Sequence, residues 1–390
     1  MGVLGVTQIV GYGTTFYLLG ILSAPISLDT GWPLHWVIAG LSIGMLCGGL
    51  ASPLVGLAID RHGGRPVLVT GSLLLALGLA GVGSATDLIF YLLGWCVIGL
   101  GMGASLYEPA FAALGRLYGS AARSAITTIT LYGGLASTIC WPLSALLNDA
   151  VGWRWACLIY ATVHVLAAVL VYLTFPPASG ERAAAHEGSI DPLPVASPDA
   201  PRSRTTLLIL LSMHLTFTAV VATVVSVHLL VILEDRGHST AAAVALGALL
   251  GPSQVAGRAI ELLIGRSIHP FWIAVASSGL IMASVAALAF DAPLVALVIV
   301  FYGAGVGVSY IVRGTLPLAL FGPIGYGTLM GRLALPSLVA QALSPWAAAV
   351  AFTHAGLYAS LLGLFLIATA NLGLLGLIAV LRPDSSQSAV

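Results

Sequence analysis

GLAIDRHGGR at residues 56–65 and GRAIELLIGR at residues 257–266 are two copies of one pattern within the same chain. The copies start at 56 and 257, an offset of 201 residues, and they share a first glycine, an Ala-Ile pair and a closing Gly-Arg pair. The acid is also kept, because Asp60 of the first copy corresponds to Glu261 of the second. Such internal similarity is the sequence signature of a structural repeat.

A second pair of matching stretches supports the duplication. GLGMGAS at 99–105 is repeated as GAGVGVS at 303–309, an offset of 204 residues. These glycines lie inside apolar segments with no strand before them, which favours close helix packing over phosphate binding. Two matches at nearly the same offset indicate that the chain consists of two related halves. That arrangement is typical of membrane transporters, whose substrate site lies between the halves.

The composition places these halves in a lipid bilayer. Of the 390 residues, 59% are hydrophobic and 7% are charged, whereas soluble domains carry about 25% charged residues. A spanning helix needs about 20 mostly apolar residues, so the chain has room for roughly a dozen of them. Between short polar breaks we expect helices at 5–28, 36–59, 67–85, 88–117, 124–148, 153–175, 205–232, 239–266, 270–290, 293–320, 327–352 and 355–381.

The charged residues of the breaks predict the orientation. Acidic residues predominate in one set of breaks, and arginine gathers in the alternate set, at Arg61, Arg65, Arg116, Arg123, Arg182, Arg202, Arg204, Arg266 and Arg382. The positive-inside rule assigns the arginine-rich side to the cytoplasm. We therefore expect an integral protein of the plasma (inner) membrane with both termini in the cytoplasm.

The longest break, at 176–204, divides the predicted helices into six and six. It is rich in Pro, Ala and Ser, and such a segment buries too little apolar surface to form a core. We expect it to be a cytoplasmic linker between an N-terminal six-helix bundle at 1–175 and a C-terminal six-helix bundle at 205–390.

The stretch GLAIDRHGGRPVLV at 56–69 resembles the loop between the second and third helices of the major facilitator superfamily. The resemblance implies an all-α fold of twelve transmembrane helices, in two six-helix bundles related by pseudo-two-fold symmetry, that rock to alternate access. It also implies that helices 1, 4, 7 and 10 line the cavity. Carried over to this chain, the loop residues and their repeat mates form a cytoplasmic gate whose opposite charges pair when the bundles close: Asp60, Arg61, Arg65, Glu261 and Arg266.

The sequence differs from the drug/proton antiporters of that superfamily. They often carry an Arg in the fourth helix and a Gly-Pro pair in the fifth, but residues 94–103 hold no Arg and residues 131–143 hold no Gly-Pro pair. Arg258, inside the predicted helix 239–266, looks similar to an Arg of the oxalate/formate and monocarboxylate branch that meets a carboxylate substrate. The resemblance therefore favours an anionic substrate.

Three charged residues lie deep within predicted helices, at Glu108, Arg258 and Arg313. Insertion scales assign an Arg at a helix centre a cost of roughly 2.5–3.5 kcal/mol, so buried charges usually mark a function or a partner. One carboxylate cannot neutralise two guanidinium groups. We therefore expect both arginines to bind an anionic substrate, with Glu108 facing them and coupling protons; a purely structural salt bridge is the alternative. Pro109 predicts a bend beside Glu108.

Four further residues are candidates for contact with a polar substrate. Tyr12, Tyr107 and Tyr310 lie in helices expected to line the cavity and could offer hydroxyl groups. His214 lies in the predicted helix 205–232 and could take part in proton transfer, although packing inside the protein is the more ordinary role for a single histidine.

The sequence also disfavours several classes of function. Its four cysteines are scattered, and no metal-ligand spacing, cofactor motif or catalytic nucleophile is evident, so we expect no metal, no cofactor and no enzyme. The sequence has no basic patch with interleaved aromatic residues, so we do not expect nucleic acid as a partner. We expect a monomeric secondary carrier whose partners are the bilayer, protons and a small organic solute such as a carboxylate. The alternatives are an efflux carrier for drugs or a toxic oxyanion or metalloid, and a transport-inactive receptor with this fold.

Overall fold

The computed structural model describes residues 2–177 and 200–381, and these residues form helices without any strand. The helices of the N-terminal half are α1 (Gly2–Thr14), α2 (Leu19–Thr30), α3 (Leu34–His62), α4 (Gly64–Gly83), α5 (Leu88–Ser105), α6 (Tyr107–Tyr118), η1 (Gly119–Ala121), α7 (Ala122–Gly134) and α8 (Ala136–Thr174). Those of the C-terminal half are α10 (Ala200–Asp235), α11 (Thr240–Gly247), α12 (Leu250–Ile264), η2 (Gly265–Ser267), α13 (Pro270–Ala289), α14 (Val295–Phe321), α15 (Tyr326–Ala355) and α16 (Leu357–Leu381).

These helices make twelve membrane crossings, as the sequence predicts. Ten helical stretches of the described chain are long and apolar enough to span a bilayer, and one of them, Leu88–Thr174, has 87 residues. The short helix η1 divides this stretch, and Gly152, with φ of 81° inside α8, divides it again. It therefore holds three crossings. Most of the predicted linker lies outside the described residues, and α10 begins at Ala200, five residues before the predicted helix start at 205.

Four predicted helices are each interrupted in the structure. The segment 5–28 is divided between α1 and α2, 124–148 between α7 and α8, and 239–266 between α11 and α12. In the first case the hydroxyl groups of Thr14 and Thr15 donate to the carbonyls of Val10 and Gly11, which bends a helix by competing with its own hydrogen bonds. The predicted segment 88–117 is divided at Leu106, between α5 and α6.

The bend at Leu106 follows from Pro109, as the sequence predicts. Proline has no N–H, so the carbonyl of Ser105, four residues earlier, loses its helical donor. The side chain of Gln8 in α1 replaces that donor, with Nε2 2.9 Å from the Ser105 carbonyl oxygen. The break is therefore satisfied by a neighbouring helix, and it aims Glu108 at the middle of the protein.

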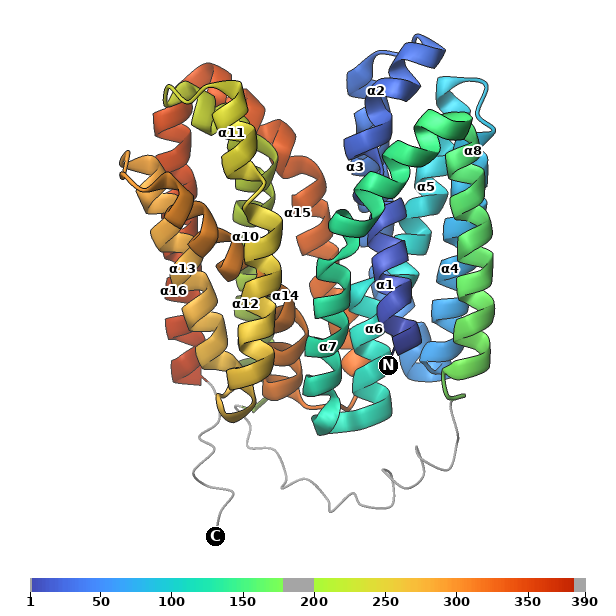
Figure 1. Cartoon of the computed structure of the whole chain (residues 1–390). Coiled ribbons are helices and arrows are strands. Elements are labelled where there is room, and N and C mark those ends of the chain that lie inside the picture. Colours follow the sequence, from blue (N-terminus) through green and yellow to red (C-terminus); the bar gives the residue numbers. More distant parts are fainter. Residues whose placement is uncertain (1, 178–199, 382–390) are drawn as a thin grey trace.

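Figure 1 shows the helices of the two halves as two groups that stand side by side. The start of α1 and the end of α16 lie near the bottom of this view, which we call the linker side. Contacts between the halves join α15 to α3 and α6, and join α7 to α12 and α14. Buried side chains of both halves form one apolar cluster there, including Ile59 and Phe111 from one half and Leu318, Tyr326 and Met330 from the other.

The repeated glycine runs lie at close helix contacts. A Cβ added at Gly99 of α5 would overlap the backbone of Gly44 in α3, and one added at Gly307 of α14 would overlap the backbone of Gln254 in α12. Only glycine permits two helix backbones to approach so closely. The packing role expected for these runs is therefore confirmed.

Candidate functional site

A cavity lies between the two halves. Tyr12 of α1 and Glu108 of α6 contribute to its wall from the N-terminal half, and Tyr310 and Arg313 of α14 and Gln341 of α15 contribute from the C-terminal half. Residues of both halves therefore form the walls of one cavity, and a charged residue of each half belongs to them.

An ion pair crosses this cavity from one half to the other. Nη1 of Arg313 lies 2.7 Å from Oε1 of Glu108, and each residue is 9% exposed. A charge-assisted hydrogen bond of this length is among the stronger polar contacts in proteins. Among the described residues, Nε and Nη2 of Arg313 have no hydrogen-bond partner, so part of the guanidinium remains available to a ligand.

Arg258 occupies a different environment from Arg313. Its Nε donates to the carbonyl of Gly307 at 3.1 Å, and its Nη1 donates to the carbonyl of Thr130 in the other half at 2.9 Å. It is 3% exposed, it does not line the cavity, and no carboxylate of a described residue lies within ion-pair distance of it. The surroundings of the two arginines therefore differ: Arg313 lines the cavity, whereas Arg258 binds two backbone carbonyls.

Three aromatic rings stand between these charges. The rings of Tyr12 and Tyr107 are 4.5 Å apart, and those of Tyr107 and Tyr310 are 5.9 Å apart. The guanidinium of Arg258 lies 5.1 Å from the centre of the Tyr310 ring, and that of Arg313 lies 5.8 Å from it. Both distances suit attraction between a cation and the face of an aromatic ring. Tyr310 therefore separates the two positive charges while contacting both.

Two of the three predicted tyrosines line the cavity. Tyr12 and Tyr310 do so, whereas the Tyr107 hydroxyl donates to the carbonyl of Thr130 at 3.1 Å. The hydroxyl can reach this carbonyl because residue 133 is glycine. A Cβ at that position would overlap the Tyr107 hydroxyl. Tyr107 thus positions its neighbours by stacking, and its hydroxyl is already occupied.

A second lobe adjoins the cavity on the side of the C-terminal half. Tyr310, Arg313 and Gln341 line both spaces, so they form the boundary between them. Thr223 of α10 and Ser309 of α14 add hydroxyl groups to the second lobe. Arg313 is thus exposed to two spaces with different linings.

The structure does not place His214 at the cavity. His214 is 2% exposed and lies against Asn371 of α16, and its Nδ1 has no hydrogen-bond partner among the described residues. One helical turn away, Thr218 lines the second lobe and accepts a hydrogen bond from Asn371 at 2.9 Å. His214 lies on the same face of α10 as Thr218 but one helical turn nearer the start of the helix, where it packs against Asn371 of α16 instead of lining the lobe.

The predicted gate residue Asp60 joins the two halves on the linker side. Its two carboxylate oxygens accept hydrogen bonds from the backbone N–H groups of Gly327 and Thr328, at 2.9 and 2.6 Å. These N–H groups belong to the first turn of α15, which begins at Tyr326. The first turn of a helix has unsatisfied donors and a partial positive charge, so a carboxylate is favoured there.

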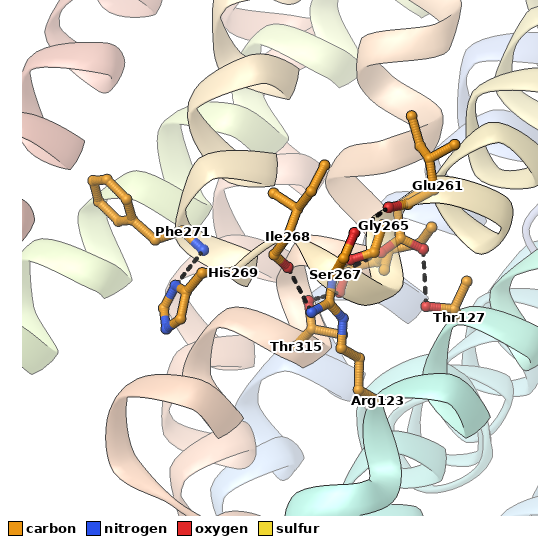
Figure 2. A network of polar contacts seen from close by, with 11 residues as sticks. Arg123, Thr127, Glu261, Gly265, Ser267, Ile268, His269, Phe271 and Thr315 are labelled. Atoms are coloured by element: carbon orange, nitrogen blue, oxygen red, sulfur yellow. Dashed lines mark hydrogen bonds and ion pairs between the residues drawn. The ribbon is translucent and has the colours of Figure 1, made fainter. Parts of the chain in front are cut away.

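Glu261, the repeat mate of Asp60, also joins the two halves, but through side chains (Figure 2). Its carboxylate lies 3.3 Å from Nη2 of Arg123 and accepts a hydrogen bond from the Thr127 hydroxyl at 3.1 Å. Arg123 donates further to the carbonyls of Gly265 and Ile268, at 2.5 and 2.7 Å. The arginine therefore neutralises the acid and also binds carbonyls of η2 and of the residue after it, just beyond the end of α12.

Two other predicted gate residues, Arg61 and Arg65, do not form an ion pair with a described residue of the other half. Arg65 lies over the ring of Tyr172 in its own half, with 4.0 Å between the guanidinium carbon and the ring centre. Arg61 is exposed on the linker side, and the side chain of Arg266 lies outside the part of the chain whose side chains are described. In the described structure the side chain of Arg65 is thus directed from α4 towards α8, and its part in the gate stays a prediction.

Arg123 and Gln341 are site residues that the sequence did not single out. Arg123 could have been found from the repeat, because Thr328, which binds Asp60, lies 205 residues after residue 123, close to the offsets of the repeated motifs. Gln341 has no such signal. It is one polar residue in an apolar helix, and only the packing of α15 against α14 places it beside Arg313.

Comparisons with known proteins agree with this architecture. A sequence profile described as Major Facilitator Superfamily matches residues 4–345. Monocarboxylate transporter 4 of Rattus norvegicus is 30% identical over 159 residues, which are 39% of this chain and 32% of that protein. Monocarboxylate transporter 11 of Homo sapiens is 32% identical over 131 residues, which are 32% of this chain and 28% of that protein. The matches span about a third of the length of these relatives.

Solved structures show the same fold at low sequence identity. The human organic anion transporter MFSD10 (TETRAN) has a TM-score of 0.73 and 16% identity, over 96% of this chain and 98% of that one. The transporter FucP in its outward conformation has a TM-score of 0.76 and 14% identity, over 98% of both chains. These values establish a common helix arrangement over the whole of the aligned chains.

Proposed function

The chain belongs to the Major Facilitator Superfamily, and on that premise we propose that it is a secondary carrier for a small organic anion. In this proposal a carboxylate of the substrate binds Arg313 in the cavity between the halves, and the halves rock to open the cavity to each side of the membrane in turn. The printed names of two kinds of similar protein, monocarboxylate transporters and an organic anion transporter, support an anionic substrate.

The position of Arg313 is the observation that carries the proposal. A guanidinium group in a membrane-spanning helix needs a partner, and Glu108 occupies one of its nitrogens. The remaining nitrogens have no partner among the described residues and border two cavity lobes. A planar guanidinium can give two parallel hydrogen bonds to a carboxylate, which an ammonium group cannot match.

The orientation follows from the arginines of the linker side. The positive-inside rule makes this side cytoplasmic, so both termini lie in the cytoplasm in this proposal, and the membrane that we propose is the plasma (inner) membrane. The two halves touch on this side through Asp60 and through Glu261. The conformation is then outward-facing, in keeping with the outward conformation named for FucP.

Glu108 is the acid that we propose for proton coupling. It competes with the substrate carboxylate for the same guanidinium, because it already holds Nη1 of Arg313 at 2.7 Å. Protonation of Glu108 would weaken this pair and free the guanidinium for a second carboxylate. A proton and an anion would then enter the site together, which is the stoichiometry of a symporter.

The experiment compares Arg313→Lys with Arg258→Lys in purified protein. Binding of a labelled carboxylate in nanodiscs should weaken about tenfold or more in Arg313→Lys, because one strong charge-assisted bond is lost. Arg258→Lys should keep the affinity of the unmutated protein and lower only its thermal stability, since Arg258 does not line the cavity. Unchanged affinity in Arg313→Lys, with reduced thermal stability, would show that the ion pair is only structural.

Glu108→Gln tests the coupling separately. This variant should still bind the carboxylate, because an amide leaves Arg313 free, and it should lose the stimulation of uptake by an inward proton gradient in proteoliposomes. Exchange of labelled for unlabelled substrate, which needs no net proton movement, should continue. Proton-driven uptake equal to that of the unmutated protein would exclude Glu108 as the coupling acid.

A further inference from the structure

Two buried hydrogen bonds tie α1 and α10, which contribute to the walls of the cavity and its second lobe, to α8 and α16. Nε2 of His164 in α8 lies 2.7 Å from the hydroxyl oxygen of Thr14 in α1. Nδ2 of Asn371 in α16 donates to the hydroxyl oxygen of Thr218 in α10 at 2.9 Å. The four residues are 8% exposed or less. Each bond therefore fixes one wall helix within its own half.

In both pairs the threonine accepts and its partner donates. Each threonine gives its own hydroxyl hydrogen to the carbonyl four residues earlier, at 2.8 Å for Thr14 and 2.9 Å for Thr218. A hydroxyl group has a single hydrogen, so the bond between Thr14 and His164 must take its hydrogen from Nε2 of the imidazole. His164 and Asn371 therefore supply the same kind of donor, an N–H group, to a threonine oxygen.

The two bonds are copies of one another in the internal repeat. Residues 14 and 218 are 204 positions apart, and residues 164 and 371 are 207 positions apart. The repeated motifs have offsets of 201 and 204 residues, so both members of each pair correspond. The donor has changed from a histidine to an asparagine, and its N–H group is kept. The hydrogen bond is therefore the feature that the two halves share.

Only the N-terminal copy accompanies a break in its helix. There Thr15 adds a second hydroxyl, which donates to the carbonyl of Gly11 at 2.5 Å. The N–H of Tyr17 then bonds the carbonyl five residues earlier at 3.0 Å, one residue further back than in an α-helix. In the other half, Ala219 stands 204 residues after Thr15, and α10 is continuous. The break therefore depends on the second hydroxyl, and the bond to His164 fixes the last residue before it.

We propose that His164 is a positioning residue of the carrier, which acts through Thr14 to hold Tyr12 in the cavity wall. Successive residues of an α-helix are about 100° apart, so Tyr12 and Thr14 project in nearly opposite directions. Tying Thr14 to α8 therefore turns Tyr12 towards the cavity, where it lies beside Glu108 with its ring 4.5 Å from that of Tyr107. Thr14 is the last residue of α1, so the regular helix does not continue past it to hold this orientation. The role is independent of which solute the carrier moves.

The experiment follows the ring of residue 12 by fluorine NMR, with fluorotyrosine incorporated at that position of the full chain in nanodiscs. The neighbouring ring of Tyr107 makes the fluorine signal sensitive to small displacements. His164→Leu removes the donor and should shift or split the signal by more than its line width. His164→Gln should keep the signal of the unmutated protein, because its amide nitrogen can donate from about the same position as Nε2.

Thermal stability separates positioning from packing. Thr14→Val leaves the N–H of His164 buried without its partner, so it should lower Tm and shift the signal. Adding His164→Leu to Thr14→Val makes both partners apolar and should recover part of the Tm, yet the signal should stay shifted because nothing ties α1 to α8 there. Asn371→Leu is the matched control. It breaks the equivalent bond of the other half, so it should lower Tm and leave the signal of residue 12 unchanged.

A shifted signal in His164→Leu and Thr14→Val, with the normal signal in His164→Gln and Asn371→Leu, supports the inference. An unshifted signal in folded His164→Leu overturns it, as does an equal shift in Asn371→Leu, which would mean general loosening. Failure of His164→Gln to keep the signal would show that the bulk of the ring matters and not its N–H. If His164→Leu does not fold, the signal of Thr14→Val decides in the same way. No solute is present, so each result leaves the proposed substrate as it stands.

Discussion

Two contacts join the halves, that of α3 with α15 and that of α12 with α7. They lie at corresponding parts of the two repeats, but different chemical groups form them. At the first contact the backbones almost touch, since a Cβ at Gly56 would overlap the carbonyl of Gly327 and one at Gly331 would overlap the carbonyl of Ser52. At the second, the side chain of Arg123 spans the space to Glu261.

The difference comes from how each copy of a shared glycine is used. Gly56 faces the other half, whereas its repeat mate Gly257 packs against Ala304 of α14 in its own half. Once the backbones at the second contact stand further apart, an acid there cannot reach the first turn of α7 directly. The duplication therefore preserves an acid at both contacts. The local spacing of the helices decides whether backbone N–H groups or a side chain bind that acid.

The largest expected effect tests the backbone contact. Gly56→Ala should prevent the linker side from closing, because the new methyl group overlaps the Gly327 carbonyl and neither backbone can move away without separating the halves. Spin labels at Tyr118 and Ile324, both exposed on the linker side, should report a longer distance, and transport should fall at least about tenfold. Gly279→Ala is the control, since its methyl group would meet no atom within 4 Å. An unchanged label distance in Gly56→Ala would contradict the tight contact.

Asp60→Asn should have the next largest effect. The substitution removes the charge from the start of α15 and leaves one amide N–H facing the N–H of Gly327 or Thr328. Helix-capping and dipole interactions of this kind are worth about 1–2 kcal/mol. The same pair of labels should therefore show a mixed population with more of the open form, and equal populations before and after the substitution would show that the carboxylate does not stabilise the closed contact.

Glu261→Gln should shift the population less than Asp60→Asn does. The lost ion pair to Arg123 is 3.3 Å long and the arginine side chain is 23% exposed, so it should be worth about 0.5–1 kcal/mol and should weaken in high salt. The amide can still accept the hydrogen bond of Thr127. A label distance more sensitive to Glu261→Gln than to Asp60→Asn would reverse the ranking of the two contacts.

The smallest expected effect concerns Arg65, which takes part in neither of the two contacts between the halves. Arg65→Ala should leave the label distance unchanged and should lower thermal stability by about 1 kcal/mol or less through the lost contact with Tyr172. The reason is that this arginine and its ring partner belong to the same half and move together. Opening of the linker side in Arg65→Ala would restore it to the gate.

The sequence predicted the number of crossings and the candidate site better than it predicted which charges interact. Glu108 and Arg313 stood out because a charge in an apolar helix is costly, and the structure brings these two together. Arg258 stood out for the same reason, yet it binds two backbone carbonyls. Side-chain cost identifies a buried charge, but it does not say whether a carboxylate, a carbonyl or a ligand satisfies that charge.

By itself, the sequence determined twelve apolar helices in two related halves, the bend at Pro109 and the acids at Asp60 and Glu261. These depend on local hydrophobicity, on the missing N–H of proline and on repeated residues, all of which are readable along the chain. Only the tertiary structure decided that Asp60 meets a helix start, that Arg123 answers Glu261, and that Gln341 lies beside Arg313. Asp60 and Thr328 are 268 residues apart, and Arg123 and Glu261 are 138 residues apart. Such partners meet through the separation and rotation of packed helices, which no local pattern encodes.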